Sequence, residues 1–268
     1  MTLPTFLIIG AMKAGTTSLW SYLGAHPDIY VAPGKELNFF VAERNWSKGL
    51  GWYEGRFADA RSPAKGEASP QYAMVHAFAG VPARIADVVP DVKIVYLIRH
   101  PIERMRSHYL HRVASGKEDR PIDRAFLEGL DYLHTSRYAF QLEPYLERFS
   151  RESILLVTSE DLRNVRAETL RAVFSFLEVD PNILPAGVEA EEHRTADKRV
   201  QSGIGRRLSA AAPTPLRRLI SKVTTRTIDP ESAVLSEDVR RRVADALRPD
   251  LERLKEIAGP GFDAWGLA

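Results

Sequence analysis

The sequence predicts an α/β fold of three layers, in which helices cover both faces of a mainly parallel central sheet. Two observations support this prediction. Short apolar runs at residues 5–10, 92–98 and 153–158 have the composition of strands that are buried on both faces. Segments with helical periodicity separate these runs, and strands that alternate with helices are typical of a parallel sheet.

The expected helices follow the strands along the chain. The first occupies residues 18–25 and ends before Pro27, because proline disfavours the helical conformation in the residue that precedes it. Residues 28–45 should form a loop with at most a brief strand, and Trp265 should anchor the tail of the chain. Further helices are expected at residues 52–57, 81–89, 101–113, 122–130, 138–149, 168–177 and 237–257.

Composition narrows the class of protein. The 268 residues are 44% hydrophobic with a net charge of +2, which argues against disorder. There is no cysteine, so disulfide scaffolds and thiol catalysis are excluded. No apolar run is long enough to span a bilayer and the N-terminus lacks the features of a signal peptide, so we expect a cytoplasmic protein. One domain is expected, with a core at about residues 3–180 and a basic loop and helical region at about 190–268.

Arginine dominates the basic side chains. It supplies 28 of the 37, and its planar guanidinium suits phosphate, sulfate and carboxylate, although GC-rich coding explains such an excess equally well. Nine basic residues and a single acid lie between residues 194 and 226, and such a block attracts a nucleotide, an acidic substrate or a lipid headgroup. Peripheral contact with a membrane is therefore open, whereas no motif predicts a nucleic-acid partner.

Residues 10–17 (GAMKAGTT) have the Gly-x4-Gly skeleton of a phosphate-binding loop between a strand and a helix. Small residues let the backbone curl so that its N–H groups face an anion, and the helix N-terminus adds a favourable dipole. A nucleotide hydrolase needs lysine directly after the second glycine, where this chain has Thr16, whereas Lys13 stands inside the loop. The loop therefore predicts a site for one 5′-phosphate without metal, with a ligand-free turn as the alternative.

A second candidate site follows the strand at 92–98. Ligands of parallel sheets bind at the carboxyl ends of the strands, which places Arg99 at the mouth of the sheet beside a helix that Pro101 starts. Ser107 lies two turns along this helix, so the two side chains could together hold a second phosphate. An ordinary surface arginine and an ordinary helical serine are the alternative.

Three ordered segments carry a resemblance to a known family. Residues 6–18 (FLIIGAMKAGTTS) resemble the 5′-phosphosulfate loop of the sulfotransferases that use 3′-phosphoadenosine 5′-phosphosulfate (PAPS), and residues 96–109 (YLIRHPIERMRSHY) resemble their 3′-phosphate motif. Residues 35–40 (KELNFF) match the Lys-Glu-x-x-Phe-Phe segment of the heparan-sulfate glucosaminyl N- and 3-O-sulfotransferases and their bacterial relatives. The resemblance covers residues 6–109, weakens from 120 to 180 and fades beyond about 190. It implies a P-loop-like sulfotransferase fold.

The resemblance also implies roles for individual residues. Lys13 would stabilise charge on the leaving nucleotide, and Glu36 would take the proton of a hydroxyl or amine acceptor, in a reaction that needs PAPS but no metal. A histidine is the second choice for the base; His100 and His108, in the 3′-phosphate segment, are expected to pack there or contact it. A solvated Glu36 paired with Lys35 is the alternative to a base. The implied donor-binding residues are Lys13, Ala14, Gly15, Thr16, Thr17, Ser18, Arg99 and Ser107.

The same resemblance places three later residues near the nucleotide. They are Tyr138, Lys198 and Arg199, although Tyr138 fits a helix core equally well and no motif fixes the register of the other two.

Departures from the family pattern concern the acceptor. Residues 67–70 (EASP) have Ala68 where the glycan-modifying branch has a lysine, and Asn38 stands where its 3-O members often have histidine. A carbohydrate, a glycolipid or a small natural product all stay open as acceptor. Glu67 is either a second acidic group near the acceptor or a structural residue at a strand end.

Two other functions are alternatives. One is a P-loop nucleotide kinase or phosphotransferase, which the misplaced Lys13 disfavours. The other is a non-catalytic module that binds a nucleotide or another anion, which would explain the basic block but not the combination of Lys13 with the Lys35–Glu36 pair.

Overall fold

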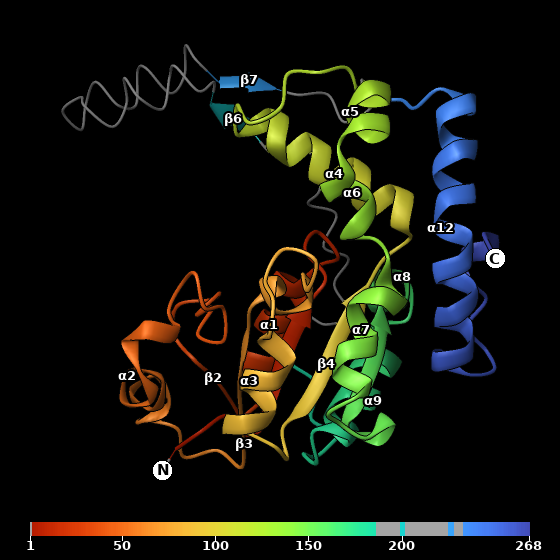
Figure 1. Cartoon of the computed structure of the whole chain (residues 1–268). Coiled ribbons are helices and arrows are strands. Elements are labelled where there is room, and N and C mark those ends of the chain that lie inside the picture. Colours follow the sequence, from red (N-terminus) through yellow and green to blue (C-terminus); the bar gives the residue numbers. More distant parts are fainter. Residues whose placement is uncertain (1, 186–198, 202–224, 228–232) are drawn as a thin grey trace.

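The computed structural model describes residues 2–185, 199–201, 225–227 and 233–268. Five parallel strands form the central sheet in the order β2-β3-β1-β4-β5, and helices lie on both sides of it (Figure 1). The strands are β1 (Phe6–Gly10), β2 (Ile29–Val31), β3 (Ala64–Ala68), β4 (Lys93–Ile98) and β5 (Ile154–Thr158). The three-layer α/β class predicted from the sequence is confirmed.

Strand β1 lies in the middle of the sheet and explains the strongest apolar run of the sequence. All five of its residues are buried, and it pairs with β3 on one side and β4 on the other. Phe6 stands opposite Gly66 in β3, where an added Cβ would lie 2.4 Å from the Phe6 carbonyl oxygen. Only glycine therefore fits at position 66, and this close approach holds β3 against the central strand.

The helices follow the expected alternation. The α-helices are α1 (Thr16–Gly24), α2 (Leu50–Glu54), α3 (Val81–Val88), α4 (Pro101–Ala114), α5 (Ile122–Glu128), α6 (Leu130–His134), α7 (Tyr138–Leu146), α8 (Ser159–Asn164), α9 (Arg166–Phe176) and α12 (Glu237–Ala258). Short 3-10 turns are η1 (Trp46–Lys48), η2 (Gly55–Phe57), η3 (Pro70–Ala73), η4 (Arg151–Ser153) and η6 (Ala264–Gly266). A separate antiparallel pair consists of β6 (Arg199–Gln201) and β7 (Thr225–Thr227).

Several elements differ from the sequence-based expectation. Strand β3 (AKGEA) is not among the strands that the apolar runs predict, because its small and charged residues lack the pattern of a buried strand; only the alternative that puts Glu67 at a strand end points to it. Helix α1 begins at Thr16 rather than at residue 18, since Gly15 already provides its N-cap. Helices α6 and α8 are too short to show a clear period, and the helix expected at 138–149 ends at Leu146.

The C-terminal helix α12 covers α7 at one side of the molecule (Figure 1). Its apolar residues at positions 239, 243, 247, 251 and 254 recur at helical spacing and are buried. Beyond it, the Trp265 Nε1 atom donates a hydrogen bond of 3.3 Å to Glu160 Oε2, and the ring lies near those of His100 and Tyr138. The expectation that Trp265 anchors the tail is confirmed.

Helices α4, α5 and α6 lie beyond the carboxyl edge of the sheet (Figure 1). In the part of the chain that the structure describes, no helix is both long and apolar enough to cross a membrane.

Most of the basic block at 194–226 falls outside the described residues. The cytoplasmic location stays a prediction.

Candidate active site

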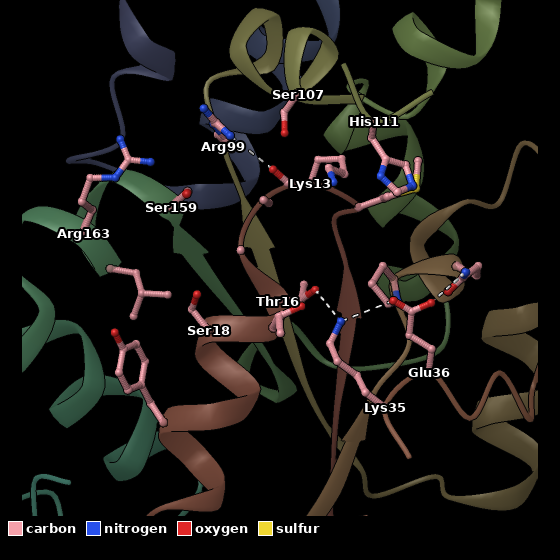
Figure 2. A pocket seen from close by; sticks show the side chains of 18 of the residues that line it. Lys13, Thr16, Ser18, Lys35, Glu36, Arg99, Ser107, His111, Ser159 and Arg163 are labelled. Carbon is pink, nitrogen blue, oxygen red and sulfur yellow. Dashed lines mark hydrogen bonds and ion pairs between the residues drawn. The ribbon is translucent and has the colours of Figure 1, made fainter. Parts of the chain in front are cut away.

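A cavity of about 510 Å³ opens at the carboxyl edge of the sheet, where β1, β4 and β5 end. Five segments far apart in the sequence meet in it: the loop after β1 with the start of α1, the loop after β2, the turn η3 after β3, the end of β4 with α4, and the helices after β5 (Figure 2). Nine of the proposed site residues line it, namely Lys13, Ala14, Gly15, Thr16, Thr17, Ser18, Glu36, Arg99 and Ser107.

The loop between β1 and α1 turns through two residues with left-handed backbone. Gly15, the N-cap of α1, has φ 103°, and Lys13 has φ 72°. Glycine adopts this conformation without steric cost, so Gly15 is the residue type that the turn requires. Among the described residues no side chain caps α1, and its first turn carries no acid. The first N–H groups of α1 are therefore available to an anion.

Arg99 and Ser107 lie together at one end of the cavity (Figure 2). The Arg99 Nη1 atom lies 3.5 Å from the Lys13 carbonyl oxygen, which links the end of β4 to the phosphate loop. Arg163 of α8 lines the same end. Burial first, and then the charge of Arg163, lower the pKa of the Arg99 guanidinium. Two guanidinium groups and a hydroxyl at one place favour a multiply charged anion such as phosphate.

Arg104 belongs to the same sequence motif but lies behind the cavity wall. It is fully buried, and its guanidinium donates hydrogen bonds to the Ser136 hydroxyl at 2.6 Å, the Tyr132 carbonyl at 2.6 Å and the Met12 carbonyl at 3.3 Å. Burial lowers its pKa to about 10, so it stays charged at neutral pH. Arg104 thus fastens the phosphate loop to α6 from behind.

Tyr138, which the resemblance places near the nucleotide, does not line the cavity. It is fully buried at the start of α7, and its hydroxyl donates a hydrogen bond of 2.6 Å to the Arg99 carbonyl. The core alternative therefore holds for Tyr138. Lys198 lies outside the described residues, and of Arg199 the structure describes only the backbone in β6.

Glu36 reaches the cavity from a turn with left-handed backbone, φ 69°. Its N–H donates to the Ala68 carbonyl at 3.0 Å, which ties the turn to the end of β3. The carboxylate receives hydrogen bonds from Lys35 Nζ at 3.4 Å and Gln71 Nε2 at 3.3 Å, and 42% of the side chain is exposed. Lys35 Nζ also lies 3.4 Å from the Thr16 hydroxyl (Figure 2). The ion pair between Glu36 and Lys35, which was the alternative to a role as base, is present, and both residues line the cavity.

Glu67 supports this turn from below and is 1% exposed. Its carboxylate accepts hydrogen bonds from Tyr72 and Ser69, both at 2.6 Å, and from Tyr53 at 3.1 Å. The Ser69 hydroxyl in turn accepts the N–H of Asn38 at 2.9 Å. Burial raises the pKa of Glu67, against the effect of these hydrogen bonds. Of the two sequence alternatives for Glu67, the structural one at a strand end holds.

The two histidines of the 3′-phosphate segment lie outside the cavity lining, whereas His111 lines it. His108 is 5% exposed and packs against the Tyr132 ring, with 4.8 Å between the ring centroids. Burial first, and then the charge of Arg104, lower the pKa of His108 to about 2. His100 is half-buried, and burial lowers its pKa as well. Neither histidine lines the cavity in which Glu36 lies.

The cavity lining also contains residues to which the sequence analysis assigned no role in the site. They are Met12, Tyr22, Lys35, Pro70, Gln71, His111, Ser159, Leu162, Arg163 and Arg166. Residues 159–166 follow β5, the third predicted strand. The rule that ligands bind at the carboxyl ends of parallel strands, applied there, would have found them. Pro70 and Gln71 follow β3, a strand that the apolar runs of the sequence do not predict.

Comparison with known proteins agrees with this geometry. A family model described as "Sulfotransferase domain" matches residues 3–200. The mouse heparan sulfate glucosamine 3-O-sulfotransferase 3B1 is 32% identical over 190 residues, which cover 65% of this chain and 46% of that protein. The bifunctional heparan sulfate N-deacetylase/N-sulfotransferase 1 of Caenorhabditis elegans is 29% identical over 196 residues, or 66% of this chain and 22% of that protein. The chain thus spans about half or less of the length of these curated relatives.

Solved structures share the fold. The sulfotransferase from Alicyclobacillus acidocaldarius superposes with a TM-score of 0.73 at 24% identity, covering 99% of this chain and 100% of that one. A mouse sulfotransferase complexed with PAP superposes with a TM-score of 0.55 at 14% identity, covering 98% of this chain and 87% of that one. The overall fold is therefore common to all three. With a family model matched over most of its length, this chain belongs to the sulfotransferase family.

Proposed function

We propose that this protein transfers a sulfuryl group from PAPS to a hydroxyl or amine of an acceptor, without a metal ion. A carbohydrate, a glycolipid and a small natural product are the acceptor classes in question. One observation carries the proposal. A phosphate loop, a second anion-binding place formed by Arg99 and Ser107, and the carboxylate of Glu36 line the same cavity. The names of the curated relatives support it.

The residues fit the two phosphates of the donor at two places. The N-terminus of α1 would hold the 5′-phosphate through backbone N–H groups and the hydroxyls of Thr16, Thr17 and Ser18. Arg99 and Ser107 would hold the 3′-phosphate at the other end of the same cavity. A site that matches a 3′-phosphate distinguishes PAPS from ATP.

Two side chains would act on the reaction itself. PAPS supplies an activated sulfuryl group whose leaving group is a phosphate. Lys13 would stabilise the negative charge that develops on this leaving group, an effect worth about 10²–10³ in rate for one preorganised donor. Glu36 would accept the proton that the acceptor loses, worth about 10²–10⁴ in rate.

A transfer assay tests this proposal. PAPS with a radiolabelled sulfuryl group is incubated with panels of monosaccharides, glycolipids, phenols and amines, with and without a chelator. We expect label on one acceptor class, unaffected by the chelator, and a loss of about a hundredfold or more in Lys13→Ala and Glu36→Gln. Glu178→Gln serves as the control, because this glutamate is exposed and pairs with Lys93 away from the cavity.

Two results would contradict the proposal. Transfer that Glu36→Gln supports as well as the wild type would remove the assigned base. Phosphoryl transfer from ATP–Mg²⁺ to the same panel, without sulfuryl transfer, would favour the kinase alternative.

A further inference from the structure

Lys35 lies between the phosphate loop and the carboxylate of Glu36 in the candidate active site. Its Nζ atom is 3.4 Å from the Thr16 hydroxyl at the start of α1 and 3.4 Å from Glu36 Oε1 (Figure 2). Its side chain is 18% exposed, so it points into the cavity rather than into solvent. It is one of two lysines in the cavity lining, the other being Lys13.

Neither contact holds the ammonium firmly. Charge-assisted hydrogen bonds are usually about 2.7–2.9 Å long. Lys35 Nζ lies 3.4 Å from both the Thr16 hydroxyl and Glu36 Oε1, so its ammonium group is shared between two weak hydrogen bonds. Lysine carries a point charge with three donors on a flexible stem of four carbons, and it can turn without a change in the backbone. An anion that enters beside Thr16 would therefore compete with Glu36 for this charge.

Glu36 keeps its place when Lys35 turns away. Its backbone N–H is bonded to the Ala68 carbonyl at 3.0 Å, and its second carboxylate oxygen receives the Gln71 amide at 3.3 Å. Glu36 is the one carboxylate in the described lining of the cavity. Its charge is neutralised by Lys35 as long as the ion pair exists.

We propose, on the basis of the proposed function, that Lys35 is, beside Lys13, a second lysine that binds the donor. Its ammonium group pairs with Glu36 in the free protein and turns to the sulfuryl group of PAPS when the donor binds. Donor binding then releases the Glu36 carboxylate for the acceptor. In the transfer step the acceptor oxygen or nitrogen bonds to sulfur, and the bond between sulfur and the bridging oxygen breaks. The electron pair of that bond stays on the 5′-phosphate of adenosine 3′,5′-bisphosphate, and the acceptor proton passes to Glu36.

The test compares PAPS with adenosine 3′,5′-bisphosphate, which lacks the sulfuryl group. Calorimetry measures the affinity for PAPS and for adenosine 3′,5′-bisphosphate, without acceptor, in the wild type, Lys35→Ala, Lys35→Gln, Glu36→Gln and the double variant. We expect both Lys35 variants to bind PAPS about tenfold more weakly and the bisphosphate at most about threefold more weakly. Glu36→Gln, which frees Lys35, should bind PAPS about threefold more tightly, and this gain should vanish in the double variant.

Lys93→Ala is the matched control. Lys93 is 25% exposed and forms an ion pair of 2.8 Å with Glu178 at the opposite end of the sheet, so it should leave both affinities unchanged. Equal losses for the two ligands in the Lys35 variants, or a gain in Glu36→Gln that survives in the double variant, would overturn the inference. Failure of the wild type to bind either ligand would instead overturn the proposed function. Thermal unfolding of each variant checks that it is folded.

Discussion

The hydroxyl of Tyr138 lies 2.6 Å from the backbone carbonyl oxygen of Arg99 and joins the start of α7 to the end of β4. Because the phenol is fully buried, Tyr138→Phe leaves this carbonyl without its partner. We expect a loss of about 1–3 kcal/mol in the free energy of unfolding, together with weaker binding of adenosine 3′,5′-bisphosphate. Urea unfolding and calorimetry measure the two effects.

A similar tyrosine outside the cavity provides the comparison. Tyr109 donates a hydrogen bond of 2.9 Å to the Arg120 carbonyl, and neither residue lines the cavity. Tyr109→Phe should lower stability without changing affinity. Equal affinity losses in both variants would show that Tyr138 does not position Arg99.

The buried carboxylate of Glu67 should be essential for the turn that carries Glu36. Glu67→Ala leaves the hydroxyls of Tyr53, Tyr72 and Ser69 without their acceptor in a buried place. A buried donor that is left without its acceptor costs about 1–3 kcal/mol, so we expect a loss of at least that size in unfolding free energy. Glu67→Gln retains an acceptor and should lose less. A change below about 0.5 kcal/mol in Glu67→Ala would contradict the role of this network.

The stability of the protein should fall in acid because of His108. Its pKa is about 2 in the folded protein, well below the usual value of about 6.5. Below about pH 6.5 the unfolded chain therefore binds a proton that the folded protein does not, and the free energy of unfolding falls by about 1.4 kcal/mol per pH unit. Urea unfolding at pH 7 and pH 5 should show that His108→Leu loses about 2 kcal/mol less than the wild type over this interval. Parallel losses would mean that His108 is protonated in the folded protein.

Asp250 should fasten α12 to the domain. Its carboxylate accepts the N–H groups of Ala139 at 3.1 Å and Phe140 at 2.9 Å in the first turn of α7. Asp250→Ala should cost about 1–3 kcal/mol in unfolding free energy, because both donors lose their partner. On the same helix Asp245 is half-exposed and pairs with Arg248, so Asp245→Ala should change stability by less than about 0.5 kcal/mol. Similar effects of the two variants would contradict the capping role.

Local sequence was enough to find the parts of the site that lie next to strong strands. The loop after β1 and the Arg99–Ser107 segment each follow an apolar run, so their position at the carboxyl edge could be deduced. Lys35 and Glu36 follow a strand of three residues, and only their resemblance to a family segment marked them.

The remaining features depend on contacts between distant segments. Tyr138 is 39 residues from the carbonyl that it bonds, and Asp250 is more than 100 residues from α7. Strand β3 lacks an apolar pattern because its pairing with β1 requires Gly66 and its end requires the buried Glu67. Such partners follow from three-dimensional packing, which no window of the sequence contains.

The most direct test of the central claim is a calorimetric titration with adenosine 3′,5′-bisphosphate and, separately, with ADP plus Mg²⁺. It uses the wild type, Arg99→Ala and the control Arg124→Ala, whose exposed guanidinium pairs with Glu128 on α5. A sulfotransferase donor site predicts metal-free binding of the bisphosphate that is lost in Arg99→Ala and kept in Arg124→Ala. Tighter binding of ADP–Mg²⁺, or no binding of either nucleotide, would contradict it.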